Sequence, residues 1–474
     1  MYTEEQNRFI VEAKASISKE PKSRLLEPAK NVIESDNFVC DAHCHIFDGH
    51  CVDGTYFLVR LLDTQNKRFL RRVIRWIVRK VLPGGDYEKG FNLRNHDLSK
   101  DEALELIYKQ NRKFDITDAD LNELFAELDQ ELKQMDSSEK EIMDFDFRGV
   151  VRRIKRVRNM LNQGEMKYVY QQFLIDAVTQ TRIHEDKDLL TIVLGMDLES
   201  GWEGSNIKPY KKQLDELLEL SKEEPIIPFF PIHPKRVELK KDVDGNPYKY
   251  NELYDLFLEY FKDNQDGYFG VKLYPALGYY PAHDTLAPIY EVCQACNIPI
   301  TVHCGGEMIS TFKKRIETNI FGKPVTVATG KRKLNARELN DPDNWFVVME
   351  KYENLKVNLA HFGGSGAWEK SRDNLHQRIQ DIILLMEKYK GIYSDFSYNF
   401  NDDEATRIFS NYMRSDAKKY SKIKERTMYG TDYWVVLPQS NMISDQEYFL
   451  DTLYEYNDVL LVDNVKSFLF DKTN

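Results

Sequence analysis

Residues 38–45 decide the expected fold, because they form an apolar run that ends in two alternating histidines: Phe38-Val39-Cys40-Asp41-Ala42-His43-Cys44-His45. Alternate side chains of a β-strand point to the same side, about 6.5 to 7 Å apart, so His43 and His45 would face one point. Seven further short apolar runs cover residues 189–196, 225–231, 268–273, 298–303, 355–361, 391–396 and 426–432. Helical patterns separate these runs, as in repeated βα units. Eight such strands predict a (β/α)8 TIM barrel, an α/β fold.

The first two expected strands are far apart in the sequence, which predicts a large helical insertion over residues 51–185. A plain βα unit needs only roughly 30 residues. Residues 1–36 are expected to form helices that precede the barrel. The barrel would then span residues 37–474 and be interrupted by the insertion.

The insertion contains blocks of opposite charge. Residues 67–82 have a basic amphipathic pattern with arginines opposite an apolar face, residues 101–146 are strongly acidic, and residues 148–158 are basic again. A basic amphipathic helix can bind an anionic membrane surface. The preferred interpretation is a helical cap whose basic and acidic helices face each other.

The composition is typical of a globular protein, with 42% hydrophobic and 30% charged residues. The net charge of -11 disfavours nucleic-acid binding, which needs a basic surplus. No apolar run approaches the roughly 18 residues of a membrane span, and no secretory signal is visible. We therefore expect a cytoplasmic protein whose six cysteines are thiols. The sequence is compatible with a homo-oligomer.

Polar side chains end several of the expected strands, and six of them could share one site. They are His43, His45, Lys272, His303, His361 and Asp432. Active sites of TIM barrels are built at the C-terminal ends of the strands, so these side chains would gather around one axis. Imidazoles together with a carboxylate suit Zn²⁺ and also tolerate Fe²⁺ or Mn²⁺. The sequence therefore predicts a divalent metal site, with zinc favoured.

Five segments that carry these residues resemble the amidohydrolase superfamily, and specifically its amidohydrolase-related branch of hydrolases, a lactonase and non-oxidative decarboxylases. They are Asp41-Ala42-His43-Cys44-His45, Gly270-Val271-Lys272-Leu273-Tyr274-Pro275 with Tyr280-Pro281, Val302-His303-Cys304-Gly305-Gly306, Ala360-His361-Phe362-Gly363-Gly364, and Tyr429-Gly430-Thr431-Asp432-Tyr433. The resemblance covers residues 37–50 and 188–470. It implies a metal-dependent TIM-barrel enzyme that acts on a small-molecule substrate.

The resemblance also implies a role for each strand-end residue. The implied metal ligands are His43, His45, His303 and Asp432, and Asp432 would also be the general base for a metal-activated water. His361 would face the substrate or a second metal and stabilise a developing oxyanion. Lys272 would be a ligand only if it were carboxylated and bridged two ions. One ion is favoured over two, because this branch is often mononuclear.

The preferred function is a metal-dependent hydrolase of a C–N or C–O bond in a small carbonyl substrate. A metal-dependent non-oxidative decarboxylase is the enzymatic alternative, because the same ligand set serves both reactions in the family. The complete ligand set disfavours a barrel that acts only as a scaffold. Candidate substrate-shaping residues are His233, Tyr279, Tyr280, Glu307, Trp434 and the run Lys331-Arg332-Lys333, which is expected in a solvated loop after the fifth strand.

Overall fold

The computed structural model describes the expected barrel and the helices before it. The described residues are 2–52, 126, 130, 164–177, 179, 187–202, 207–241, 247–262, 267–305, 309–311, 313–330, 332–372, 374–437 and 441–473. Most of the expected insertion over residues 51–185, including its charge blocks over 67–82, 101–146 and 148–158, lies outside the described residues.

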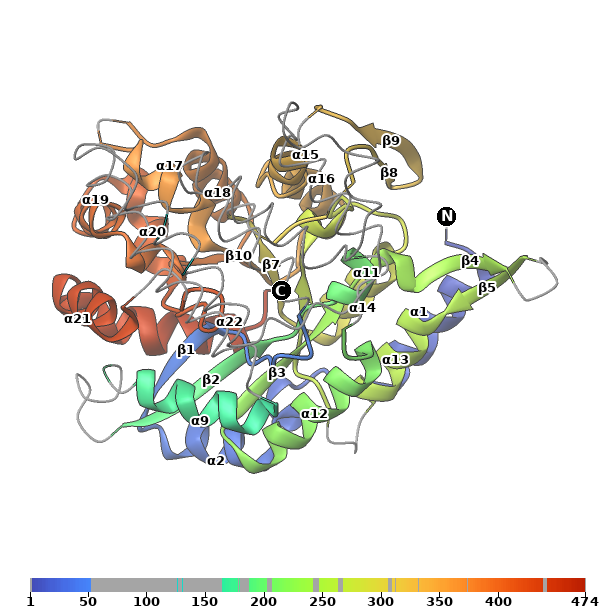
Figure 1. Cartoon of the computed structure of the whole chain (residues 1–474), viewed down its shortest axis with the longest axis horizontal. Coiled ribbons are helices and arrows are strands. Elements are labelled where there is room, and N and C mark those ends of the chain that lie inside the picture. The colour runs from blue at the N-terminus through green and yellow to red at the C-terminus, as the bar shows by residue number, and fades with distance from the viewer. Residues whose placement is uncertain are drawn as a thin grey trace.

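Eight parallel strands form the barrel in the order β1-β2-β3-β6-β7-β10-β11-β12 (Figure 1). Their bounds are β1 Phe38–Cys44, β2 Asp188–Leu194, β3 Ile226–Ile232, β6 Gly270–Leu273, β7 Ile300–His303, β10 Val357–Ala360, β11 Ile392–Asp395 and β12 Thr427–Met428. The last strand returns to the first, because the Ala42 amide donates to the Tyr429 carbonyl at 3.0 Å and Cys44 forms a parallel bridge with Tyr433. The structure confirms the predicted TIM barrel, and each strand overlaps the apolar run that predicted it.

Helices cover the outside of the barrel. They are α1 Glu4–Ser16, α2 Glu27–Ser35, α9 Met166–Asp176, α11 Leu198–Gly201, α12 Tyr210–Glu223, α13 Glu252–Phe261, α14 Ala287–Cys296, α15 Arg332–Leu339, α16 Asn344–Lys351, α17 Ser365–Glu369, α18 Gln377–Lys388, α19 Asp403–Met413, α20 Ser421–Arg426, α21 Met442–Thr452 and α22 Asn464–Phe470. Short 3₁₀ and π turns are η1 Pro21–Arg24, η2 Pro234–Arg236, η3 Pro275–Leu277, η4 His361–Gly363, η5 Asn399–Asn401, η6 Lys418–Tyr420, η7 Tyr454–Tyr456 and η8 Val459–Asp463. Strands β1 and β3 are buried along their whole length, as expected for a parallel sheet covered by helices.

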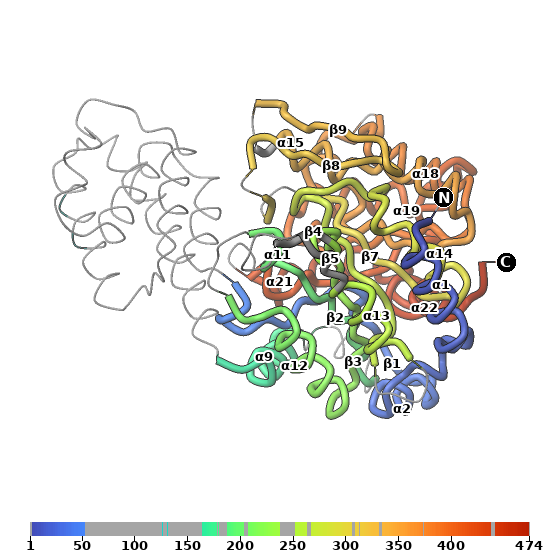
Figure 2. Tube along the Cα trace, turned by 90° about the vertical axis from the view of Figure 1, so that its right-hand side faces the viewer, coloured from blue at the N-terminus to red at the C-terminus, as the bar shows by residue number. Residues whose placement is uncertain are grey.

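The chain before β1 forms α1 and α2, which lie against the outside of the barrel (Figure 2). Helix α1 begins at a capping box, in which the Thr3 hydroxyl accepts from the Gln6 amide at 3.2 Å and the Gln6 side chain accepts from the Thr3 amide at 3.0 Å. The helix packs against α14, and the Phe9 ring stacks on Tyr254 of α13 with centroids 4.6 Å apart. These contacts attach the N-terminal segment to the barrel.

Two β-hairpins lie outside the barrel: β4 Val237–Lys241 with β5 Pro247–Asn251, and β8 Ile316–Ile320 with β9 Lys323–Val327. The second hairpin and α15 occupy the segment after the fifth strand, where a solvated loop was expected, so that expectation is wrong. Phe321 and Gly322 join β8 to β9 with φ of 45° and 81°, as in the two-residue turns that connect antiparallel strands. Lys331 lies outside the described residues, and Arg332 is the first residue of α15.

Two expectations drawn from composition agree with the structure. All six cysteines lie in the described residues, and none forms a disulfide. All six are buried, which is typical of structural rather than reactive thiols. Among the described residues, no helix combines the length and apolar character that crossing a membrane requires.

Candidate active site

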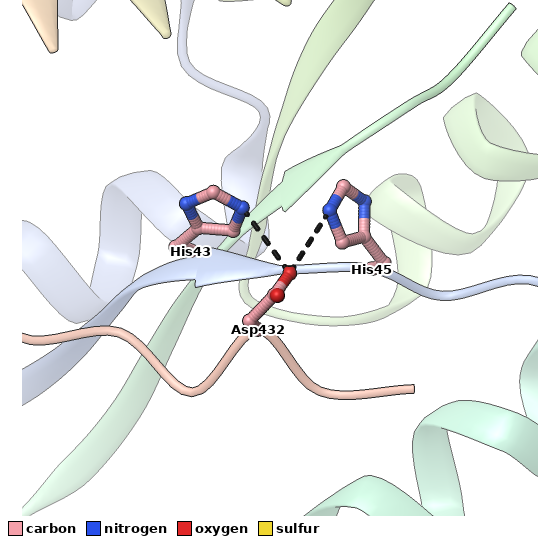
Figure 3. Close-up of side chains that lie close together, drawn as sticks. All are labelled: His43, His45 and Asp432. Atoms are coloured by element: carbon pink, nitrogen blue, oxygen red, sulfur yellow. Dashed lines mark ion pairs between the residues drawn. The ribbon is translucent and has the colours of Figure 1, made fainter. Parts of the chain in front are cut away.

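Two histidines from the end of β1 face one aspartate from the loop after β12 (Figure 3). The Nε2 atoms of His43 and His45 lie 3.4 and 3.3 Å from Asp432 Oδ1. All three side chains are buried. The Asp432 amide donates to the His43 carbonyl at 2.7 Å, so the loop after β12 is tied to β1 where the three side chains meet.

Hydrogen bonds indicate which ring nitrogen of each histidine carries a proton. His45 Nδ1 lies 2.7 Å from the carbonyl oxygen of Leu194, which can only accept, so Nδ1 is protonated. His43 Nδ1 lies 2.9 Å from Asp395 Oδ2 and donates to that carboxylate. In a neutral imidazole this arrangement leaves a lone pair on Nε2. Two nitrogen lone pairs and a carboxylate oxygen therefore point toward one another.

A divalent cation fits this set of donor atoms. Zn²⁺ binds histidine nitrogen and carboxylate oxygen at about 2.0 to 2.2 Å, and a tetrahedron with such bonds has edges of about 3.3 to 3.6 Å. The separations of 3.3 and 3.4 Å between Asp432 Oδ1 and the two Nε2 atoms lie in that range. The potential ligand atoms of this set all lie within 4.8 Å of one another. Both these distances and the lone pairs on the two unprotonated Nε2 atoms suit a metal ion.

The electrostatics of the site favour a positive charge at the same point. Burial would raise the pKa of Asp432, but its contacts with His43 and His45 hold that pKa well below the ordinary value. Burial and Lys272 would lower the pKa of His43, yet Asp395 and Asp432 outweigh them and raise it. Burial lowers the pKa of His45 to about 4. An ionised Asp432 and a neutral His45 are the protonation states that metal binding requires.

His361 and His303 form a neighbouring pair. His361 begins η4 directly after β10 and has a φ of 68°, a left-handed conformation that few non-glycine residues adopt. Its Nε2 atom lies 2.9 Å from Nδ1 of His303, and the His303 ring stacks on Tyr274 with centroids 4.0 Å apart. The structure thus places His303 beside His361 and outside the three converging donors, so its role as a ligand stays a prediction.

Lys272 reaches the same centre from β6. Its Nζ atom lies 3.5 Å from His43 Nε2, and the residue is only 1% exposed. Burial lowers the pKa of Lys272 to about 8, although Asp432 and Asp395 oppose this effect. A buried lysine with a lowered pKa has a larger neutral fraction than a surface lysine, and the neutral amine is the form that carbon dioxide carboxylates. Whether Lys272 bridges two ions stays a prediction.

Part of the chain that contributes to this site is similar to a known protein family. Residues 258–456 match the amidohydrolase family model. This segment, which is less than half of the chain, is similar to the amidohydrolase family. The matched segment includes four of the residues gathered at the site, namely Lys272, His303, His361 and Asp432. Amidohydrolases are generally metal-dependent, which agrees with the candidate ligand set around Asp432.

Solved structures of other proteins also resemble the chain. A protein described as amidohydrolase II is 14% identical, and the alignment covers 63% of this chain and 88% of that one, with a TM-score of 0.36. The 4-oxalomesaconate hydratase from Rhodopseudomonas palustris is 11% identical over 91% of this chain and 95% of its own, with a TM-score of 0.31. No curated protein matches the chain significantly. These likenesses carry no information about the reaction.

Asp395, which ends β11, lies at the candidate site and was not expected there from the sequence. Its Oδ2 accepts from His43 and from Asn358 Nδ2 at 2.7 Å. Its Oδ1 accepts from the backbone amides of His361 and Ser397 at 3.0 and 3.1 Å, and from the Ser397 hydroxyl. Burial would raise the pKa of Asp395, but the nearby histidines and these hydrogen bonds hold it well below the ordinary value. Its position at the end of an apolar run was a usable signal.

Three of the proposed substrate-shaping residues, His233, Tyr279 and Tyr280, have structural contacts elsewhere in the chain. His233 is buried, caps η2 and lies against Tyr279 with ring centroids 4.8 Å apart. The Tyr280 hydroxyl lies 2.6 Å from a carboxylate oxygen of Glu338. Glu307 lies outside the described residues. None of these three side chains contacts the three converging donors among the interactions found in the described residues.

Trp434 differs from these candidates, because it belongs to an aromatic wall beside the ligand set. The Phe47 ring stacks on His45 with centroids 5.3 Å apart, and Trp434 meets Phe47 edge-on at 5.7 Å. Both aromatic side chains are buried. The candidate site is therefore apolar on the side of His45.

Gly430 gives a direct test of how tightly the candidate site is packed. A Cβ atom at this position would lie 2.6 Å from His43 Cβ and 2.7 Å from its backbone nitrogen. We expect Gly430→Ala to destabilise the protein by about 1–3 kcal/mol through overpacking, measured by urea unfolding. Gly366→Ala is the matched control, because nothing lies within 4 Å of its added Cβ. Equal stability of the two variants would contradict the packing described here.

Proposed function

We propose that the protein is a metal-dependent hydrolase that cleaves a C–N or C–O bond in a small carbonyl substrate. The observation that carries this proposal is the convergence of His43 Nε2, His45 Nε2 and Asp432 Oδ1 on one point. These residues would hold the ion, with His303 as a further ligand. Zinc is the proposed metal, because nitrogen-rich sites with a carboxylate are typical of catalytic zinc.

The chain's own residues suit hydrolysis by an activated water. When bound, a divalent metal lowers the pKa of water to about 7 and polarises a carbonyl group. Asp432 is ionised, so its carboxylate would accept a proton from the attacking water and pass it to the leaving group. The hydrogen bond between the Asp432 amide and the His43 carbonyl holds this base in place.

His361 is the second proposed catalytic residue. Its ring lies beside His43, with centroids 4.7 Å apart, and is buried. A substrate held at the converging donors would therefore lie within reach of His361. The aromatic side chains of Phe47, Trp434 and Tyr274 would exclude water around such a substrate, and this supports a small, uncharged reacting group.

A screen of zinc-loaded protein against small amides, lactones and esters in oxygen-18 water tests this proposal. We expect one product to contain the labelled oxygen. Release of carbon dioxide from an unsaturated or aromatic carboxylate, with no labelled oxygen in the organic product, would instead support the decarboxylase alternative. Turnover that is unaffected by complete removal of the metal would refute both.

The one-ion proposal predicts that Lys272 is unmodified. Carbon-13 bicarbonate labels a lysine carbamate, and its carbon signal is visible by NMR. We expect no carbamate signal in the zinc-loaded protein and no second bound ion. A signal that is present in the wild type and absent from Lys272→Ala, together with two ions per chain, would instead establish the carboxylated bridge.

The cap interpretation of residues 51–185 is also a proposal. Helix α9, which the structure describes, packs against α12, and its Phe173 ring lies 5.0 Å from Tyr433, the residue after Asp432. Helix α9 of the insertion therefore lies beside the candidate site. This position supports the interpretation of the insertion as a cap in preference to a separate membrane-binding element. A cytoplasmic location and a homo-oligomeric state stay predictions from the sequence.

A further inference from the structure

Asp395 is linked to the rings of two histidines of the site. It contacts His43 directly and His361 through the Ser397 hydroxyl. We propose that Asp395 is a positioning residue that sets which ring nitrogen carries the proton in His43 and, through Ser397, in His361. The inference rests on the metal centre proposed above. It adds a residue outside the proposed ligand and catalytic sets and gives a defined tautomer to His361.

The carboxylate of Asp395 is fully occupied by hydrogen-bond donors. A carboxylate offers about four lone-pair positions. Asp395 receives hydrogen bonds from His43 Nδ1, Asn358 Nδ2, the His361 amide, the Ser397 amide and the Ser397 hydroxyl, and it is completely buried. Asp395, His43 and His361 also form a group with metal-ligand spacing. Because no lone pair of Asp395 is left for an ion, we assign this carboxylate to positioning and not to ligation.

The direct contact fixes His43. Asp395 Oδ2 accepts a hydrogen bond from His43 Nδ1, and the unprotonated Nε2 atom faces Asp432 Oδ1. A carboxylate in this position orients a ligating imidazole and raises its basicity. Asp395 would therefore strengthen metal binding without touching the ion.

The indirect contact fixes His361. The Ser397 hydroxyl donates to Asp395 Oδ1, so its oxygen must accept from His361 Nδ1, 2.9 Å away. The Ser397 carbonyl, 3.3 Å from the same nitrogen, can also only accept. Both neighbours require a proton on Nδ1. In the neutral ring, Nε2 of His361 is then unprotonated and accepts a hydrogen bond from His303 Nδ1, which lies 2.9 Å away.

This tautomer changes the role expected for His361. The contacts of Nδ1 with Ser397 and of Nε2 with His303 Nδ1 place the ring proton on Nδ1. A His361 ring whose only proton is on Nδ1 presents an acceptor at Nε2 and no N–H group at that atom. The geometry therefore favours His361 as a proton acceptor over the oxyanion stabiliser expected from the sequence.

Asp395→Asn tests the link to His43. The backbone amides of His361 and Ser397 can only donate hydrogen bonds, so the side-chain oxygen of the asparagine should face them. The NH₂ group of the asparagine should then face His43 Nδ1. His43 would then carry its proton on Nε2, the atom proposed to bind the ion. We expect zinc affinity to fall about ten- to hundredfold, measured by competition with a chromophoric chelator.

Ser394→Ala is the matched control for this region of β11. Ser394 is buried and precedes Asp395, and its hydroxyl donates to the Leu359 carbonyl without contacting a histidine. Its removal should leave zinc affinity unchanged. Ser397→Ala should also keep the affinity, because Ser397 contacts His361 and none of the three converging donors, but it should raise the fraction of His361 protonated on Nε2.

Nitrogen-15 NMR of histidine-labelled protein reads this tautomer directly, with His361→Asn to assign the signals. We expect wild-type His361 to be protonated on Nδ1. A wild-type His361 protonated on Nε2 would overturn the proposal without any variant having to fold. Wild-type zinc affinity in Asp395→Asn would overturn the link to His43. A wild-type protein that binds no zinc would instead contradict the proposed function, while the His361 tautomer would still be measurable.

Discussion

Asp432→Asn is expected to lower kcat by about 10²- to 10⁴-fold, as for the loss of a general acid–base, while part of the metal is retained. The asparagine keeps the shape of Asp432 and still offers an oxygen to the ion. Its amide cannot accept a proton at neutral pH, so proton transfer is lost and binding is less affected. Steady-state kinetics on the substrate found in the screen, together with metal analysis, measure the two effects separately.

Asp176→Asn is a suitable control for this variant. Asp176 lies near the same loop and accepts a hydrogen bond from the Tyr433 hydroxyl at 3.2 Å, which an asparagine oxygen can also accept. It is not one of the three converging donors, so kcat and metal content should both stay at the wild-type level. An Asp432→Asn protein with full metal content and the wild-type rate would remove Asp432 from the mechanism.

Replacing both His43 and His45 by alanine is expected to abolish metal binding and turnover. Two of the three donor atoms that converge on one point would be lost, and the Asp432 carboxylate with the proposed ligand His303 would not retain a transition metal at that position. The barrel should still fold, because its strands are held mainly by apolar packing and backbone hydrogen bonds. Metal content and cooperative thermal unfolding measure these two expectations.

The matched control replaces two half-buried histidines that lie elsewhere, His283 and His376, by alanine. His283 Nδ1 accepts a hydrogen bond from the Thr285 amide, and His376 Nδ1 accepts one from the Arg378 amide. Neither histidine is one of the three converging donors. This protein should keep its metal and its activity. Retained activity in the His43 and His45 double variant would refute their assignment as ligands.

The barrel could be predicted from the sequence because each strand is a short apolar run followed by a helical pattern. His43, His45 and Asp432 could be expected to meet for the same reason, since strand ends converge at one face of a barrel. The hairpin formed by β8 and β9 was missed, because its strands are polar and partly exposed and its turn depends on a positive φ at Phe321.

The proton positions of the site could not be predicted from the sequence. They depend on Leu194, Asn358 and Ser397, whose contacts with His45, Asp395 and His361 exist only after strands β1, β2, β10 and β11 have come together. Positive φ angles at His361 and Asp432 also aim their side chains into the site, and a sequence pattern does not reveal such strained positions. The strand-end pattern therefore predicts which residues gather and leaves their hydrogen bonding undetermined.

Elemental analysis of the purified wild-type protein tests the central claim, a divalent metal centre at His43, His45 and Asp432, most directly. The geometry predicts about one transition-metal ion per chain, with zinc retained through gel filtration after reconstitution and lost in the double alanine variant. A wild-type protein that holds no metal even after reconstitution with zinc would contradict the claim.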